Sequence, residues 1–369
     1  MFTSRYAISG STILTTLLFG CQIVLGQGPA NVKAANAKAD GYVRRMMSKH
    51  HIPGVSLMVL RKGKPIHTKN YGFADLENSV AVTSWSVFQI CSITKSLTAI
   101  GVMLLAEDGK LSVDDLVIRH LPYLSKSGNE ITIRQLLSHT SGITAYENRP
   151  EAVGQECADT LPDLENWLKN FDLASKPGDE WAYQNTGYAI LGKVIEQVSG
   201  RAYGDFLHKR IFEPLGMNDT RMLNYDDMIS RRVSGYIYRD GKYLNGPNIN
   251  TEVEAASGGL VSTTLDLARL DAALFTEKLL KQKTLKEMWS PARLAGGRTV
   301  DSYGLGFGLS PYKGKSRVGH TGGCPPGFST AFQRFTDDRV SVILLTNADQ
   351  EPGFIGNASN EIAYFYLRK

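Results

Sequence analysis

The stretch FQICSITKSLTAIGVMLLAEDGKL, residues 88–111, is expected to decide the fold of this chain. Its composition predicts a helix that is apolar on nearly every side, and such a helix belongs in a protein core. Ser92 and Lys95 stand three residues apart in the first turn, with Cys91 just before them. Residues at this spacing share one helix face. The sequence therefore places a hydroxyl, an amine and a thiol together where a core helix begins.

The pair Ser92 and Lys95 is chemically suited to nucleophilic catalysis. A hydroxyl at a helix start lies near the positive end of the helix dipole, which favours a developing alkoxide. Burial favours the neutral form of the amine, and a neutral amine can take the serine proton. The alternative is an N-capping serine followed by a surface lysine, a common pattern. A second S-x-x-K, Ser310 to Lys313, contains Pro311 and is expected in loop or strand. From these residues alone, both interpretations remain open.

Two further segments carry suitable groups. The pattern Y-x-N occurs three times, at 146–148, 183–185 and 243–245, and each copy could be a turn beside an aromatic residue. A buried tyrosine beside a lysine can share its proton, and an asparagine can hold a substrate carbonyl. In VGHTGGCPPGF, residues 318–328, small residues would let a substrate lie along a strand edge. The backbone N–H groups of Gly323 and Ser92 could then form an oxyanion hole. The plainer interpretation is a strand that ends in a Gly-Pro turn.

Strand patterns occur at both ends of the chain, with helical patterns between them. A helix is predicted over 31–51, and two strands flank a Lys-Gly turn within 54–72. Residues 113–300 are expected to be mostly helix and loop. Strands return at 316–323, 328–338 and 339–347, before a closing helix at 356–369. The order predicts an α+β fold: one antiparallel sheet built from both chain ends, flanked by helices, with a mostly helical second lobe over about 113–300. The active site is expected between the two lobes.

Composition excludes some partners and suggests export. The 369 residues are 42% hydrophobic and 21% charged, with a net charge of +5 and no basic run, so no nucleic-acid partner is expected. Residues 1–32 hold one charged side chain, Arg5, and an apolar segment. We expect a signal peptide over 1–26, one main domain over 27–369 and a periplasmic or secreted protein. The alternatives are a retained membrane anchor, or a membrane tether through lipidated Cys21.

Together these residues resemble the serine β-lactamase and penicillin-binding protein superfamily, on its class C β-lactamase, D-alanyl-D-alanine carboxypeptidase and esterase side. The resemblance runs from about Gly54 to the C-terminus and keeps the family's order of segments. Those segments are ITIRQLLSHTSGI (131–143), PGDEWAYQNTGYAILGKVIEQVSG (177–200), IFEPLGMNDT (211–220), ASGGLVSTTLDLARL (256–270) and YGLGFGL (303–309). The implied fold is that of the β-lactamases and transpeptidases.

The resemblance implies roles for several residues. Ser92 would be the nucleophile, Lys95 the proton acceptor and Tyr183 the proton shuttle, which selects one of the three Y-x-N copies. Asn185 would bind the substrate amide. His320, Thr321 and Gly322 stand where the family has K-T-G or H-T-G and would bind substrate. A histidine is mostly neutral at pH 7 and anchors a substrate carboxylate less well than a lysine. His320 therefore makes β-lactam hydrolysis less expected as the main activity.

The resemblance also implies a disulfide between Cys91 and Cys324. Their positions lie side by side in this fold, and some class A carbapenemases join the corresponding pair. The alternative is two reduced, closely packed cysteines. Cys157 is left unpaired. The pair His50 and His51 and the lone His139 lack metal-ligand spacing, so neither a metal nor a cofactor is expected, and His139 is expected to be structural.

The expected function is that of an exported serine hydrolase that works through an acyl-enzyme. Its substrate would be a small ester, D-amino-acid peptide or β-lactam, and the loops at 144–165 and 221–255 would select among them. The alternative is a penicillin-binding or sensing protein that acylates without efficient turnover. A complete set of Ser92, Lys95, Tyr183 and Asn185 fits both.

Overall fold

The computed structural model describes residues 30–124, 128–145, 168–246, 248, 255–324 and 327–367. The expected signal peptide over 1–26, Cys21, Cys157 and the Y-x-N copy at 146–148 lie outside these residues. Within the described residues, no helix has the length and hydropathy needed to cross a membrane.

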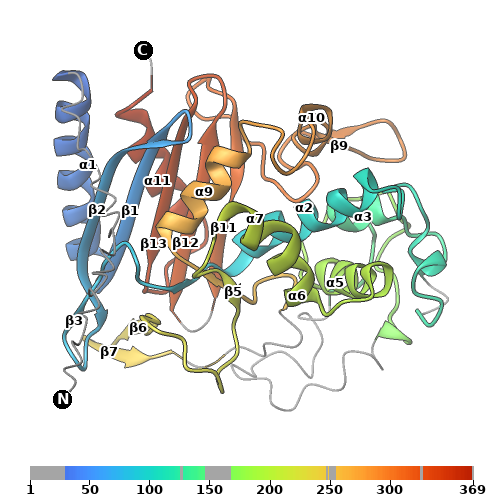
Figure 1. The fold of residues 1–369 in the computed structure, drawn as a ribbon, viewed down its shortest axis with the longest axis horizontal. Helices are drawn as coiled ribbons and strands as arrows, with labels where there is room; N and C mark the ends of the chain where they lie inside the picture. The colour runs from blue at the N-terminus through green and yellow to red at the C-terminus, as the bar shows by residue number, and fades with distance from the viewer. Residues whose placement is uncertain are drawn as a thin grey trace, which may run out of the picture.

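The sheet contains six antiparallel strands in the order β11-β12-β13-β1-β2-β3 (Figure 1). Strands from the two chain ends meet at its centre, where β1 pairs with β13. This confirms the predicted fold class. The strands are β1 (Gly54–Arg61), β2 (Lys64–Asp75), β3 (Val80–Ala81), β11 (Arg317–Cys324), β12 (Phe328–Phe335) and β13 (Val340–Thr346). Strand β11 ends the order, so one of its edges has no neighbouring strand of this sheet.

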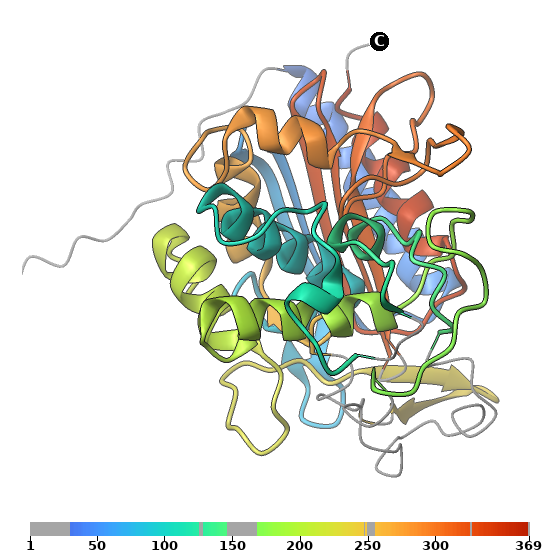
Figure 2. The ribbon, with the colours of Figure 1, turned by 90° about the vertical axis from the view of Figure 1, so that its right-hand side faces the viewer.

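Alternation along β1 explains why the sheet is covered on both faces. Leu57 and Val59 pack with helices α1 (Ala30–Lys49) and α11 (Phe354–Tyr364), whereas Met58 and Leu60 pack into the larger core on the other face. Figure 2 shows the blue and red strands between these terminal helices and the green and teal helices of the middle of the chain. The turn between β1 and β2 is Lys62-Gly63, with φ angles of 54° and 72°. Two positive φ angles suit a type I′ hairpin turn, as its Lys-Gly sequence predicts.

The helices in the middle of the chain include α2 (Thr94–Glu107), which follows the 3₁₀ turn η1 (Cys91–Ile93), and α5 (Thr186–Ser199). Others are α3 (Ile133–Leu137), α9 (Thr264–Ala273), α10 (Gln282–Met288) and the 3₁₀ turn η2 (Val117–Arg119). A further helical stretch consists of α6 (Tyr203–Leu207), a π-helical turn (His208–Phe212) and α7 (Glu213–Leu215), and it stops at Gly216, whose φ is 68°.

Short strands also occur in the middle of the chain, which was expected to be mostly helix and loop. The strands β4 (Phe88–Gln89), β5 (Arg221–Met222) and β8 (Leu260–Ser262) form a small sheet, and β9 (Ala292–Arg293) pairs with β10 (Thr299–Val300). A hairpin joins β6 (Tyr236–Arg239) to β7 (Lys242–Asn245) through Asp240-Gly241, with φ angles of 53° and 79°. An Asp-Gly pair between strand-forming residues is a hairpin signal that could have been recognised in the sequence. The Y-x-N copy at 243–245 lies in β7.

A buried ion pair fastens α9 to the sheet. The Arg334 Nε donates to Asp271 Oδ1 over 2.7 Å, both side chains are fully buried, and Ser341 Oγ donates to the same oxygen over 2.7 Å. Removing one partner would leave an uncompensated charge in the core.

We expect Arg334→Met to lower the free energy of unfolding by about 3–5 kcal/mol, because Asp271 then stays buried without its cation. The double variant Arg334→Met with Asp271→Leu is expected to regain most of that loss, since an apolar pair of similar volume carries no desolvation penalty. Denaturant unfolding of both variants measures the difference. A loss below about 1 kcal/mol in the single variant would show that the pair contributes no more than an exposed one.

Candidate active site

Ser92 lies in the sharp turn that leads from β4 into α2. Cys91, immediately before it, has a φ of 46°, in the left-handed region that residues with a Cβ seldom occupy. Ser92 is partly exposed, whereas Cys91 and Ile93 on either side are buried. The turn therefore presents the Ser92 side chain to the outside of an otherwise buried segment.

Lys95 is fully buried and is held by three oxygen atoms. Its Nζ donates to Ser92 Oγ over 3.1 Å, to Asn185 Oδ1 over 2.7 Å and to the backbone oxygen of Ser257 over 2.9 Å. The two carbonyl oxygens can only accept, so they fix two N–H bonds of the amine. The third direction points to Ser92, and the proton in that direction can be exchanged between the two side chains. The structure thus brings Ser92, Lys95 and Asn185 together.

Tyr183 lies beside this group, but not as the buried residue that we expected. Its side chain is 43% exposed, because it projects from the loop before α5 and covers Lys95 on the solvent side. The Lys95 Nζ lies 5.0 Å from the centroid of the Tyr183 ring. Asn185 follows at the N-cap position of α5. The Y-x-N copy chosen from the sequence is therefore the one beside Lys95.

The free edge of β11 faces the same space. At this edge the Gly319 N–H donates to the Gly308 oxygen over 3.0 Å, and the Gly308 N–H donates to the Gly319 oxygen over 2.7 Å. Because the direction of backbone groups alternates along a strand, Thr321 and Gly323 present their N–H groups at this same edge. A Cβ on Gly322 would lie 2.6 Å from the Ile90 oxygen. Only glycine lets β11 pack this closely against the Ser92 turn.

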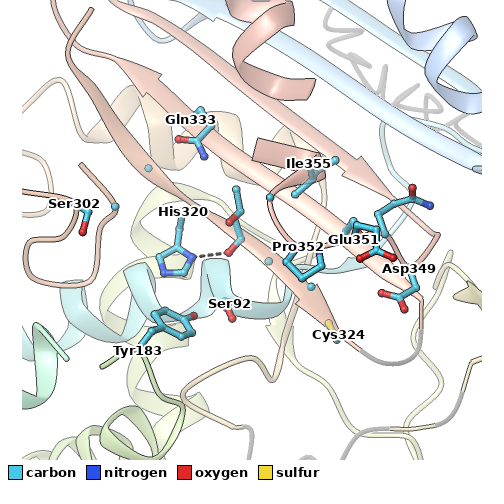
Figure 3. A pocket seen from close by; sticks show the side chains of 18 of the residues that line it. Ser92, Tyr183, Ser302, His320, Cys324, Gln333, Asp349, Glu351, Pro352 and Ile355 are labelled. Atoms are coloured by element: carbon cyan, nitrogen blue, oxygen red, sulfur yellow. Dashed lines mark hydrogen bonds between the residues drawn. The ribbon is translucent and has the colours of Figure 1, made fainter. Parts of the chain in front are cut away.

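His320 is buried and has both ring nitrogens occupied. Its Nε2 lies 2.9 Å from the Tyr303 hydroxyl. Its Nδ1 lies 2.6 Å from the Thr321 backbone oxygen, and the dashed line in Figure 3 marks this bond. Burial, followed by the charge of Lys95, lowers the pKa of His320 to about 3, so the ring is neutral. Burial raises the pKa of Tyr303 well above its usual range. The network assigns the proton to Nδ1, and Nε2 accepts from Tyr303.

A disulfide joins Cys91 to Cys324, the pairing that the family resemblance implies. The two Cα atoms are 5.8 Å apart, and 233 positions separate them in the sequence. The bond links the turn that carries Ser92 to the end of the edge strand that carries Gly323. The two proposed oxyanion donors are therefore tied together covalently.

Replacing Cys324 by alanine is expected to lower the free energy of unfolding by about 2–5 kcal/mol, because the bond closes a long loop in the unfolded chain. The matched comparison is the unmodified protein kept in reductant, which should lose a similar amount. Non-reducing peptide mass spectrometry checks the bond itself. Free thiols at both positions in the purified protein would contradict the pairing.

The pocket at the site has a volume of about 930 Å³ and follows the free edge of β11. Figure 3 shows Ser92 and Tyr183 on one side of the strand, and Gln333 and Ile355 on the other. Sequence reasoning missed several lining residues, which come from segments far apart in the chain: Trp181, Ile237, Arg239, Ser302, Tyr303, Arg317, Gln333, Asp349, Glu351, Pro352 and Ile355. Of these, Tyr303 could have been suspected, because it opens the family-like segment 303–309.

Other candidates from the sequence lie elsewhere. Ser310 and Lys313 are not among the pocket residues, and Lys313 pairs with Glu361. The loop expected at 144–165 is described only up to residue 145, whereas the 221–255 segment contributes Ile237 and Arg239 from the hairpin. Across the described residues, no group of three or more His, Cys, Asp or Glu side chains could hold a metal ion.

Comparison with known proteins agrees with this geometry. The family model described as Beta-lactamase matches residues 39–363. Penicillin-binding protein 4* of Bacillus subtilis (strain 168) is 34% identical over 325 residues, which cover 82% of this chain and 70% of that protein. The octameric penicillin-binding protein homologue from Pyrococcus abyssi has a TM-score of 0.76 at 28% identity, covering 89% of this chain and 77% of that one.

A second similar solved structure is that of an amidase. The D-amino acid amidase from Ochrobactrum anthropi SV3 has a TM-score of 0.74 at 27% identity, covering 92% of this chain and 99% of that one. Sequence and fold agree over most of the chain in each comparison. This chain belongs to the Beta-lactamase family of serine hydrolases.

Proposed function

We propose that the protein is an exported hydrolase that forms an acyl-enzyme on Ser92 with esters and with amides of D-amino acids. The observation that carries the proposal is the fully buried Lys95 amine with one of its three hydrogen bonds directed at Ser92 Oγ. An amine held in this way can activate a serine without a histidine. Export is supported by the composition of residues 1–32, and a mature N-terminus at Gln27 would be its test.

The reaction proceeds in two balanced steps. Ser92 Oγ bonds to the substrate carbonyl carbon and gives its proton to Lys95 Nζ, while the carbonyl oxygen accepts from the N–H groups of Ser92 and Gly323. The bond to the leaving group breaks, and Tyr183 relays a proton to that group. Water then attacks the acyl carbon, and the bond from that carbon to Ser92 Oγ breaks. The acid leaves with the hydroxyl group of the water, and the other proton of the water passes to Ser92 Oγ. Asn185 holds both Lys95 and the substrate amide.

The state of His320 supports substrates without a carboxylate beside the scissile bond. Its Nδ1 proton is bound to Thr321, and its Nε2 is occupied by Tyr303. The ring is neutral and has no free N–H to offer to an anion. Two cations, Arg239 and Arg317, also line the pocket, and the Arg317 Nε donates to the Ser310 backbone oxygen over 2.7 Å. The amidase neighbour, whose structure is described in complex with D-phenylalanine, is consistent with this substrate class.

A matched pair of substrates tests this preference. D-alanyl-D-alanine and D-alanyl-D-alanine amide differ only in the terminal carboxylate. We expect capping to change kcat/KM by less than about tenfold, because no charge-assisted hydrogen bond worth about 1.5–3 kcal/mol is lost. A strong preference for the free carboxylate would contradict the proposal. p-Nitrophenyl acetate, D-phenylalanine amide and nitrocefin complete the panel.

The same panel, together with a labelled penicillin, distinguishes the hydrolase from a penicillin-sensing protein. A labelled penicillin that stays bound for hours, in a protein that turns over neither ester nor amide, would favour a sensor. Turnover of ester or amide with loss of the label would favour the hydrolase.

A further inference from the structure

We infer that His139 is a positioning residue for Tyr183, an inference that rests on the proposed function. The sequence indicated only a structural histidine. His139 lies just after α3, is 1% exposed and has a φ of 60°. The proposed reaction does not use the His139 ring, yet the Tyr183 ring packs against it.

His139 holds the backbone on both sides of Tyr183. Its carbonyl oxygen accepts from the Ala182 N–H over 2.9 Å, and its ring Nδ1 accepts from the Gln184 N–H over 3.4 Å. The residues before and after Tyr183 are thus attached to the same histidine. The first bond would survive in any residue at 139, but the second requires an acceptor on the side chain.

The His139 ring also contacts the Tyr183 ring. The two centroids are 4.4 Å apart, with an interplanar angle of 43°. Tyr183 is 43% exposed, and within the described part of the chain its hydroxyl has no hydrogen-bond partner. Its orientation over Lys95 must therefore come from packing and from the backbone that carries it. His139 supplies both.

The protonation state of His139 suits this role. Burial, followed by the charge of Lys95, holds the pKa of His139 well below its usual range. The neutral ring keeps Nδ1 as an acceptor and carries its proton on Nε2, which has no hydrogen-bond partner among the described residues. Tyr303, with its centroid 4.8 Å away, supports the ring from another side. A protonated ring would lose its bond to Gln184.

Two variants separate the two contacts. His139→Asn keeps a side-chain acceptor near the Nδ1 position and tolerates a positive φ, but it removes the ring. His139→Phe keeps the ring and removes the acceptor. Both are expected to lower the rate constant of acylation by p-nitrophenyl acetate about 10- to 100-fold, with KM nearly unchanged, since a small displacement of a catalytic group costs this much. Burst amplitudes normalise each rate to the fraction of folded, acylatable enzyme.

A double-mutant cycle shows whether the effect passes through Tyr183. In a Tyr183→Phe background, His139→Asn is expected to cause little further loss of acylation rate. Equal losses in both backgrounds, or a normal rate in both single variants, would overturn the inference. If Tyr183→Phe alone acylates normally, the inference is overturned as well. Failure of the proposed function looks different, because Ser92→Ala would then remain active.

Discussion

Replacing Ser92 by alanine is expected to lower hydrolysis of the preferred ester or amide by about 10⁴-fold or more, since loss of a nucleophile removes the covalent pathway altogether. Stability should change little, because Ser92 is partly exposed and its side chain accepts one hydrogen bond, from Lys95. Steady-state rates and burst amplitudes with p-nitrophenyl acetate provide the measurement.

The chain contains a matched control for this variant. Ser310 begins the second S-x-x-K, but it does not line the pocket, and Arg317 binds its backbone oxygen rather than its side chain. Ser310→Ala is therefore expected to keep full activity and to form the acyl-enzyme normally. Full activity in Ser92→Ala, or its loss in Ser310→Ala, would place the nucleophile elsewhere.

Replacing Lys95 by methionine is expected to slow acylation of Ser92 by about 10²–10⁴-fold, because the serine loses its proton acceptor. Methionine has a similar length, so the change removes the amine with little change in volume. Asn185 Oδ1 and the Ser257 oxygen also lose their Lys95 donor, which should lower the free energy of unfolding by about 1–3 kcal/mol for each group left unsatisfied.

Arginine at position 95 is the informative comparison. It restores a cation and several donors but stays protonated, so it cannot accept the serine proton. Lys95→Arg should therefore acylate as slowly as Lys95→Met. Recovery of the rate with arginine would mean that position 95 supplies charge alone, and an unchanged rate with methionine would remove Lys95 from the mechanism.

The predictions that succeeded rest on local patterns. The contact between Ser92 and Lys95 could be predicted because the two residues lie three positions apart where η1 continues into α2. The strands at both ends could be predicted because apolar runs are bounded by turn residues. Asn185 and His320 came from the family resemblance, since nothing in the chain between them fixes their distance from Lys95. The Ser257 oxygen that holds Lys95 was not foreseen, because any residue can supply a backbone carbonyl.

The errors have equally physical causes. The hairpin around Asp240-Gly241 was missed because its strands are short and only partly buried, so their alternation is weak. Tyr183 was expected to be buried because the chemistry requires it beside Lys95, but a side chain can cover a buried amine while its other face remains in solvent. The hydrogen bond between Tyr303 and His320 depends on a loop that returns to β11. The periodicity of apolar residues in the sequence does not indicate where such a loop lies.

Because the sheet is built from both chain ends, the order of synthesis also determines when the enzyme can become reactive. A ribosome makes Ser92 and Lys95 early, but β11, with Gly323, comes from the last part of the chain. Strands so far apart in sequence pair slowly, because a long loop must close first. A growing chain thus carries its nucleophile without the second proposed oxyanion donor. Reactivity towards esters should appear only after synthesis has passed β11. This order of synthesis protects Ser92 of the unfinished chain from acylation.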